Sequence, residues 1–328
     1  MTANRRISVL ITAHNAARTI GPCLKSLAAQ KAGGGDVEVV LVDDRSTDGT
    51  SEAALAAGLQ ALRVLRVEQA ASSGLTTRQD ALALGIGAAR GEVVLTMDAD
   101  GLAAPDWIAS MSRPVLSGAA DAVAGPVFFR AARGWLGVWQ TVDVAYYLLL
   151  CSLLNALGFA GGVLFGNFAF RRELFDAVGG FERIGFTLTE DLAFSRALKA
   201  HGSRIRYSAK GAVEVEACES WSVLVERAKR VSSGGFSALS LWLGVWMALL
   251  PVLAVPALFF GGTFGGLLLA RYLAGAAFCA VALIRVGRLS HLPAALVYEP
   301  LAIAIGLRVM ARLARNSQVN WGGKSYAR

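Results

Sequence analysis

The sequence predicts an α/β domain with a mostly parallel mixed sheet, followed by C-terminal membrane helices. Over residues 1–130, short apolar segments alternate with amphipathic ones, which is typical of parallel strands covered by helices. Hydrophobic residues make up 55% of the 328 residues, and charged residues only 17%. This composition excludes a disordered chain and indicates a folded domain with membrane segments attached.

Four apolar segments are the predicted strands of the sheet. They lie at residues 7–12, 37–42, 62–67 and 92–97. A helix is predicted over 18–30, where Ile20, Leu24 and Leu27 recur on one face, and another over 77–90. Ligands bind at the carboxyl ends of parallel strands. The acidic pairs at two of these ends therefore mark the candidate site: Asp43 with Asp44, and Asp98 with Asp100.

Asp98 and Asp100 are the sharpest chemical feature of the sequence. Two residues apart on extended backbone, their carboxylates point the same way and repel unless a positive charge lies nearby. Oxygen ligands of this kind suit Mg²⁺ or Mn²⁺, with diphosphate oxygens completing the shell. The alternative is a solvated turn or a helix cap, because Ala104-Pro105-Asp106 opens the next predicted helix.

A second acidic pair, Glu190 and Asp191, opens an amphipathic helix. One interpretation is purely structural, since Thr187 and Glu190 have the spacing of a capping box and acids favour a helix N-terminus. The functional interpretation makes Asp191 a carboxylate general base, with Glu190 capping or orienting it.

Three basic residues and one histidine are further candidates. Arg227 and Arg230 share a helix face beside Lys229 and could hold a diphosphate, or could be basic residues at a membrane boundary. His14 follows the first strand, so its ring could stack on a base or simply be satisfied within the loop.

The excess of basic charge is confined to the apolar part of the chain. The net charge is +8, of which residues 1–235 contribute +1 and residues 236–328 contribute +7, with Glu299 the one acid among the latter. Basic residues flanking membrane segments explain this distribution. We therefore expect a membrane partner and no nucleic acid.

Cysteine and histidine spacing indicates neither disulfides nor zinc. The four cysteines form no CxxC pair and are expected to be free thiols in a reducing compartment: Cys23, Cys151, Cys218 and Cys279. The three histidines lack metal-ligand spacing.

Two membrane spans are predicted after residue 235. Residues 231–270 carry no charge, and we expect spans over 238–260 and 264–284, with Arg271 snorkelling toward the interface. A third apolar run, 292–307, contains Glu299 and has basic residues at both ends, so we expect a re-entrant or interfacial helix there and a basic tail on the cytoplasmic side.

The uncharged run 144–170 would also pass for a span by hydropathy alone. A single crossing would place Asp98 and Asp100 on the other side of the membrane from Glu190 and Asp191. We therefore expect an apolar surface of the catalytic domain that faces the bilayer and ends in a buried strand near residues 166–170.

Several motifs together resemble glycosyltransferase family 2 over roughly residues 5–235. They are ISVLITAHN (7–15), VDDRSTDGT (42–50), AARGEVVLTMDAD (88–100), GNFAFR (166–171), GGF (179–181) and TED (189–191). The resemblance implies a GT-A fold with a nucleotide-sugar-binding half and an acceptor-binding half. It also implies roles for single residues: Thr12, His14 and Asp44 around the base, Arg78 near the nucleotide, Asp98 at ribose or metal, Asp100 at the metal, and Asp191 as base.

Two departures from the family pattern narrow this expectation. The processive synthases carry QxxRW, whereas this chain has Arg227-Ala-Lys-Arg230-Val231, so we expect a non-processive enzyme. The tail around Trp321 and Lys324 is similar to the WKGR-x-Y ending of membrane-attached members with lipid-like acceptors, such as carotenoid glucosyltransferases, with Gly-Gly-Lys in place of Lys-Gly-Arg.

The resemblance thus implies a metal-dependent inverting glycosyltransferase, in two domains over 1–235 and 236–328. A UDP-sugar is the favoured donor and a lipid-like hydroxyl the acceptor, with Arg230 and the metal neutralising the diphosphate, and Trp321 and Lys324 near the donor. The expected location is the cytoplasmic membrane, multi-pass, with the catalytic domain in the cytoplasm. The alternatives are a polyprenyl-phosphate acceptor and a non-catalytic membrane scaffold or transport subunit.

Overall fold

The computed structural model describes residues 7–30, 36–69, 73–130, 134–232, 238–315, 319–321 and 324–326. The chain divides into two compact units. Unit 1 comprises Met1–Ala131 with Tyr147–Ala217, and unit 2 comprises Ala132–Tyr146 with Cys218–Arg328. The division at residue 235 stays a prediction, and helix α5 (Gly134–Ala156) contributes to both units.

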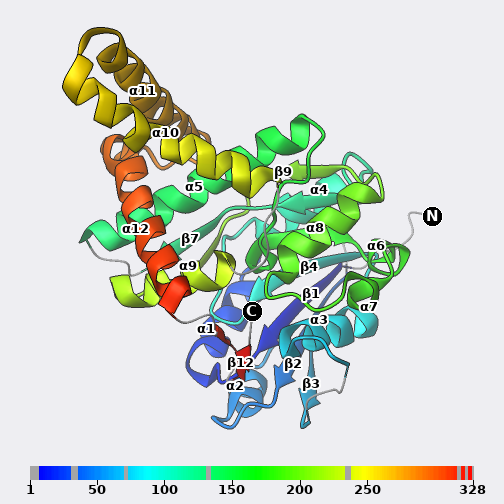
Figure 1. The fold of residues 1–328 in the computed structure, drawn as a ribbon. Helices are drawn as coiled ribbons and strands as arrows, with labels where there is room; N and C mark the ends of the chain where they lie inside the picture. Colours follow the sequence, from blue (N-terminus) through cyan, green and yellow to red (C-terminus); the bar gives the residue numbers. More distant parts are fainter. Residues whose placement is uncertain are drawn as a thin grey trace. The chain divides into compact units, whose positions relative to one another are not determined.

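Unit 1 contains a seven-stranded sheet in the order β3-β2-β1-β4-β8-β6-β9 (Figure 1). The strands are β1 (Ile7–Ala13), β2 (Val37–Asp44), β3 (Leu62–Val67), β4 (Val93–Asp98), β6 (Ala122–Ala124), β8 (Phe168–Arg171) and β9 (Ile205–Tyr207). Strands β1 to β4 are mutually parallel, and β9 is parallel to β6. Strand β8 runs antiparallel to both β4 and β6. The predicted mostly parallel mixed sheet is confirmed.

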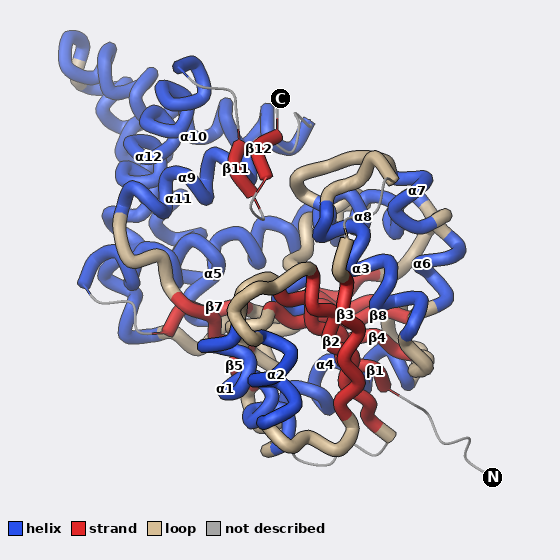
Figure 2. Tube along the Cα trace, turned by 90° about the horizontal axis from the view of Figure 1, so that it is seen from below, coloured by secondary structure: helices blue, strands red, loops and turns tan. Residues whose placement is uncertain are grey.

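Helices cover both faces of the parallel strands because alternate side chains of each strand point to opposite faces. Ile7, Val9 and Ile11 of β1 belong to the core with α1 (Ala17–Ala28), α2 (Thr50–Ala56) and α4 (Trp107–Leu116). Leu10 points the other way, against α3 (Thr77–Ala88), where Gly85 has no side chain and lets the helix approach. Figure 2 shows α1 and α2 on one side of these strands and α3 on the other.

A three-stranded sheet and an aromatic cluster complete unit 1. The small sheet has the order β5-β10-β7, formed by β5 (Leu102–Ala103), β10 (Val213–Glu216) and β7 (Val127–Arg130). The short elements η1 (Phe165–Asn167), α6 (Glu173–Ala177) and α7 (Gly180–Ile184) lie around β8 in the chain. Phe168 and Phe170 of β8 pack against Phe194 of α8 (Glu190–Ala200), which anchors that helix to the sheet.

Unit 2 is mainly helical. Its elements include α9 (Trp221–Ser232), α10 (Ala238–Phe260), α11 (Gly262–Arg285), η2 (Leu289–Ala294), α12 (Ala295–Arg315) and the hairpin of β11 (Val319–Trp321) with β12 (Lys324–Tyr326). Within the described part of the chain, four helical segments are long and apolar enough to cross a membrane: Gly134–Ala156, Leu243–Phe260, Gly262–Arg285 and Leu289–Arg315. The predicted spans 238–260 and 264–284 coincide with α10 and α11.

Arg271 does not snorkel, so that expectation is wrong. Its side chain is buried, and its Nη1 lies 2.7 Å from Oε2 of Glu299 on α12. Glu299 also accepts a hydrogen bond from Trp246 Nε1 on α10, at 3.1 Å. The carboxylate at mid-length of α12 therefore has a buried counter-charge, which removes the argument that a lone charge keeps α12 out of the bilayer.

The apolar run 144–170 has a mixed environment. Leu148 and Leu149 of α5 are buried, whereas Leu157 and Phe159 beyond the helix end are exposed. The buried strand expected near its end is confirmed as β8. Contact of the exposed residues with a bilayer stays a prediction.

Candidate active site

The first part of the site is formed where β1 and β2 end. The backbone turns through positive φ at Asn15 and Arg45, a conformation that L-residues seldom adopt. His14 Nδ1 donates a hydrogen bond to the Asp44 carbonyl at 2.7 Å, and Asn15 Oδ1 accepts one from Thr47 N at 2.9 Å. Since a carbonyl can only accept, Nδ1 carries the proton and Nε2 is the acceptor in the neutral ring.

The acidic residues after β2 have different tasks. Asp43 is buried and accepts hydrogen bonds from Ser46 N and the Ser51 hydroxyl, so it shapes the turn. Asp44 accepts from Arg45 Nε at 2.8 Å and from Nη2 at 3.2 Å. Asp44 is also buried, at 8% exposure, and its place around the base stays a prediction. Thr12 pairs with Asp98 across β1 and β4 and so belongs to the same edge of the sheet.

Arg78 joins two parts of the site that are far apart in sequence. Its Nη2 donates to Asp98 Oδ1 at 2.7 Å, and its Nε donates to Glu190 Oε1 at 2.6 Å. Burial alone would lower the pKa of Arg78, but the two carboxylates outweigh it and raise that pKa. This guanidinium fixes the start of α8 against the end of β4.

Asp100 lies two residues beyond the end of β4 and is held by its neighbours. Its Oδ2 accepts a hydrogen bond from Glu216 N at 3.1 Å, and its carbonyl accepts one from Arg130 Nη1 at 2.7 Å. Burial, followed by the charge of Asp98, raises the pKa of Asp100. The same carboxylates, after burial, raise the pKa of the Cys23 thiol to about 12. The end of β4 therefore carries an excess of negative charge.

Asp98 and Asp100 fit a divalent cation. Both carboxylates are hard oxygen donors. Burial and the charge of Asp98 raise the pKa of Asp100, so a nearby cation would stabilise its ionised form. No group of three or more His, Cys, Asp or Glu side chains within the described residues could hold a metal. The two carboxylates would therefore share the ion with oxygens of a bound diphosphate and water. Neither residue caps α4, whose N-cap is Asp106, so the helix-cap alternative is wrong.

Glu190 and Asp191 occupy the first turn of α8. The expected capping box is wrong, because the N-cap is Thr189 and Glu190 binds Arg78 instead. Asp191 is half-buried, and its Oδ1 accepts from Leu192 N at 2.8 Å. Its charge also acts on Tyr147 of α5. Asp191 thus faces the part of α5 that belongs to unit 1.

Four predicted donor-binding residues belong to unit 2. Arg227 is exposed and Arg230 half-buried on α9, next to the buried Lys229. Trp321 and Lys324 pair in the hairpin of β11 and β12, and their side chains lie outside the described part of the structure. A role for these four residues at the donor stays a prediction.

Sequence reasoning missed several residues that build the site. Gly166 is one, since a Cβ there would lie 2.6 Å from Asp98 Oδ2. Arg130 and Glu216 are others, together with Arg18, which donates to Glu216 Oε2 at 2.6 Å. The capping box of Thr76 and Gln79 at the start of α3 was also missed, although its spacing could be recognised in the sequence.

Comparison with known proteins shows what this chain is similar to. The model of "Glycosyl transferase family 2" matches residues 8–179, more than half of the chain. The chain is 27% identical over 234 residues to the beta-monoglucosyldiacylglycerol synthase of Nostoc sp., covering 70% of this chain and 49% of that protein. It is 29% identical over 119 residues to the glycosyltransferase GlyG of Streptococcus pneumoniae, covering 36% and 38% respectively. The matches thus span about half or less of each relative.

Solved structures show the same fold. A mannosyltransferase from Pyrobaculum calidifontis, solved in complex with GDP-Man and Mn²⁺, has a TM-score of 0.54 at 21% identity and covers 91% of this chain and 88% of its own. GalNAc-T7, solved with UDP, GalNAc and Mn²⁺, has a TM-score of 0.50 at 18% identity, over 71% and 48% respectively. At these identities the likeness supports the GT-A fold alone.

Proposed function

The chain belongs to glycosyltransferase family 2, and from this membership we propose that it transfers a sugar from a nucleotide-diphosphate sugar to a hydroxyl of a membrane lipid, with inversion and without processive polymerisation. One observation carries the proposal. Arg78 binds both Asp98 and Glu190, which places the carboxylates at the end of β4 and the start of α8 in one site. This contact supports the proposal because Asp191, the proposed base, directly follows Glu190 in the chain.

The donor binds along the strand ends. His14, Asp44 and Thr12 form the edge for the base, with a UDP-sugar favoured, and Asp98 and Asp100 would hold Mg²⁺ or Mn²⁺. When bound, the ion supplies positive charge that stabilises the leaving nucleotide. Arg78 holds the Asp98 carboxylate in position for this task, with Nη2 2.7 Å from Oδ1.

Asp191 is the proposed base. It accepts the proton of the acceptor hydroxyl while the oxygen attacks the anomeric carbon from the face opposite the leaving diphosphate. Glu190 does not share this task, because Arg78 binds it and it is buried. In this proposal Glu190 has a positioning role, and Asp191 transfers the proton.

The lipid acceptor rests on two supports. Four segments of the described chain are apolar and long enough to span a bilayer, and one relative is named a glucosyldiacylglycerol synthase. We accordingly propose a multi-pass protein of the cytoplasmic membrane with unit 1 in the cytoplasm. Impermeant thiol labelling of single cysteines in a cysteine-free background tests this. Thr263→Cys should label on intact cells, and His201→Cys, at an exposed position of unit 1, should be protected.

The decisive experiment measures release of nucleoside diphosphate. Membranes containing the protein receive UDP- or GDP-sugars, with and without vesicles that contain diacylglycerol, and the lipid products are extracted and identified. We expect release that depends on one nucleotide sugar, on the lipid and on Mg²⁺ or Mn²⁺. Asp191→Asn should lower the lipid-dependent release by roughly 10²–10⁴-fold, whereas Asp176→Asn, at an exposed aspartate on α6, should not change it. Release that is equal in Asp191→Asn and wild type would refute the role of the base.

A further inference from the structure

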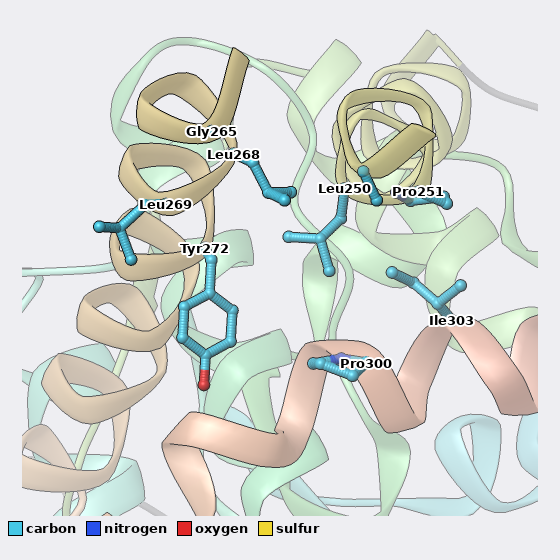
Figure 3. Close-up of a pocket in the computed structure, with 9 residues that line it drawn as sticks. Leu250, Pro251, Gly265, Leu268, Leu269, Tyr272, Pro300 and Ile303 are labelled. Atoms are coloured by element: carbon cyan, nitrogen blue, oxygen red, sulfur yellow. The ribbon is translucent and has the colours of Figure 1, made fainter. Parts of the chain in front are cut away.

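Helices α10, α11 and α12 of unit 2 form an apolar groove, which Figure 3 shows with Leu250, Leu268 and Ile303 facing the same space. The residues that line it are exposed or half-buried, so the groove is part of the apolar surface of these helices. Such a surface is expected of candidate membrane spans. In unit 1, by contrast, the buried side chain of Gln79 has specific polar partners.

Gln79 lies in the first turn of α3 and is fully buried. Its Nε2 donates a hydrogen bond to the Gly185 carbonyl at 2.9 Å, 106 residues further along the chain, and its Oε1 accepts one from Thr187 N at 3.3 Å. Because a carbonyl only accepts and a backbone N–H only donates, these partners define which end of the amide is the nitrogen. One side chain therefore fixes two backbone groups of the segment 185–187.

The fixed segment leads directly into α8. Thr187 Oγ1 accepts a hydrogen bond from Thr189 N at 3.1 Å, and Thr189 is the N-cap of α8. The side chain of this N-cap makes no capping bond, so other contacts hold the first turn in place. Arg78 of α3 provides one by binding Glu190, and the fixed segment provides another. Asp191 is the next residue after Glu190.

The residue type at position 79 separates two roles. The same Oε1 accepts a hydrogen bond from Thr76 N at 3.1 Å, and Thr76 Oγ1 accepts one from Gln79 N at 3.2 Å, which completes a capping box at the start of α3. A glutamate would serve the capping box equally well. An ionised glutamate could not donate to the Gly185 carbonyl, so the amide nitrogen serves the segment before α8 and not the cap.

We infer that Gln79 is a positioning residue for Asp191, an inference that rests on the proposed function. By fixing residues 185–187 it sets the start of α8, and so the place at which the Asp191 carboxylate meets the acceptor hydroxyl. A displacement of a reacting group by about 1 Å can lower a rate about 10²-fold. Loss of the amide should therefore lower turnover through Asp191 and leave donor binding unchanged.

The test compares two substitutions of similar size at the start of α3. Gln79→Met removes both bonds to the segment 185–187, whereas Thr76→Val removes the capping hydroxyl and leaves the Gln79 amide in place. Transfer of radiolabelled sugar to diacylglycerol is measured with the full chain. We expect Gln79→Met to lower kcat about 10- to 100-fold with the KM for the nucleotide sugar unchanged, and Thr76→Val to change neither.

A cycle with Asp191→Asn distinguishes positioning from general destabilisation. If Gln79 acts through Asp191, Gln79→Met should cause little further loss in the Asp191→Asn background, measured as residual transfer over long incubation. Losses that multiply in the double variant, or equal losses of kcat in Gln79→Met and Thr76→Val, would overturn the inference.

Hydrogen exchange of the purified protein gives a second measurement, which does not depend on turnover. The amides of residues 187–191 should exchange faster in Gln79→Met than in the wild type, and at the wild-type rate in Thr76→Val. Equal exchange in Gln79→Met and the wild type would also overturn the inference. If Gln79→Met does not fold, Thr187→Val takes its place in the cycle, because it removes the hydroxyl that binds Thr189 N and leaves every bond of the Gln79 amide intact.

Failure of the proposed function gives a different result. No transfer by the wild type, or equal turnover in Asp191→Asn and the wild type, would refute the proposed function and with it the role of Gln79. A large loss in Asp191→Asn, together with losses that multiply in the double variant, would refute the positioning role alone.

Discussion

Two arginine–carboxylate clusters in this chain use the same side chains for opposite purposes. In unit 1, Arg78 faces Asp98 and Glu190, and its side chain is 21% exposed, beside an Asp98 that is 35% exposed. In unit 2, Arg271 faces Glu299 alone, and the two are 5% and 3% exposed. The first cluster has more carboxylates than cations and is open, whereas the second is balanced and closed.

The difference shows what determines the role of a charged cluster. A closed pair with matched charge and all its bonds made inside the protein, as around Arg271, has nothing to offer a ligand and fixes helix packing. An open cluster with surplus negative charge, as around Asp98 and Asp100, is suited to binding a cation, which is the role proposed for it. The ratio of carboxylates to arginines and the exposure of the side chains distinguish the two clusters, and the residue types do not.

The largest effect should come from the open cluster. Asp100→Ala removes one of the two proposed metal ligands and should reduce sugar transfer to background, while Asp106→Ala, an exposed aspartate on the N-terminal side of α4, should not. A chelator should inhibit the wild type, and Mg²⁺ or Mn²⁺ should restore it, as measured by nucleotide release. Full activity in excess chelator contradicts the metal role.

Asp191→Asn should have the next largest effect. The amide is nearly the same size, so the protein should keep its melting temperature, while turnover falls by roughly 10²–10⁴-fold, the usual contribution of a general base. Glu190→Gln should fall less, because it weakens only the bond to Arg78. A loss in Asp191→Asn below about tenfold would return the residue to a structural role, or would indicate an acceptor that is already an anion, such as a polyprenyl phosphate.

Substitutions in the closed cluster of Arg271 and Glu299 should lower the free energy of unfolding. Arg271→Met or Glu299→Leu alone leaves a buried charge without its partner and should cost about 3–5 kcal/mol, whereas the double variant should recover most of that loss. Denaturation of the purified protein in detergent, followed by tryptophan fluorescence, measures the cycle. Additive losses in the double variant would show that the pair is not coupled.

The smallest effect should be a gain in thermal stability from a substitution of Asp100. Burial and Asp98 raise the pKa of Asp100, so the folded protein holds that proton more tightly than the unfolded chain, and ionisation costs stability as pH rises through the shifted pKa. Asp100→Asn should therefore raise Tm at neutral pH without divalent cations, and the difference should shrink as pH falls toward about 4, the ordinary range for aspartate. An unchanged or lower Tm at neutral pH contradicts this sign.

The sequence predicts the local elements of this protein better than the contacts between residues that are far apart in the chain. Each parallel strand from 7–12 to 92–97 was predictable because apolar runs, turn residues and helix periodicity are local signals. The bond between Arg78 and Glu190 was not, because 112 residues separate them and Glu190 had a local explanation as a cap. Likewise, Arg271 and Glu299 lie 28 residues apart on different helices. In the sequence each therefore looks like an isolated charge within an apolar segment.

Gly166 has a consequence for how this protein can change over generations. A side chain there would meet the Asp98 carboxylate, so glycine is required as long as Asp98 is kept in place. A lineage that lost the carboxylate would be released from this requirement, and alanine could then enter position 166. Substitutions at positions 98 and 166 are therefore expected to occur together. A larger residue at 166 in a descendant would indicate an enzyme that no longer uses Asp98.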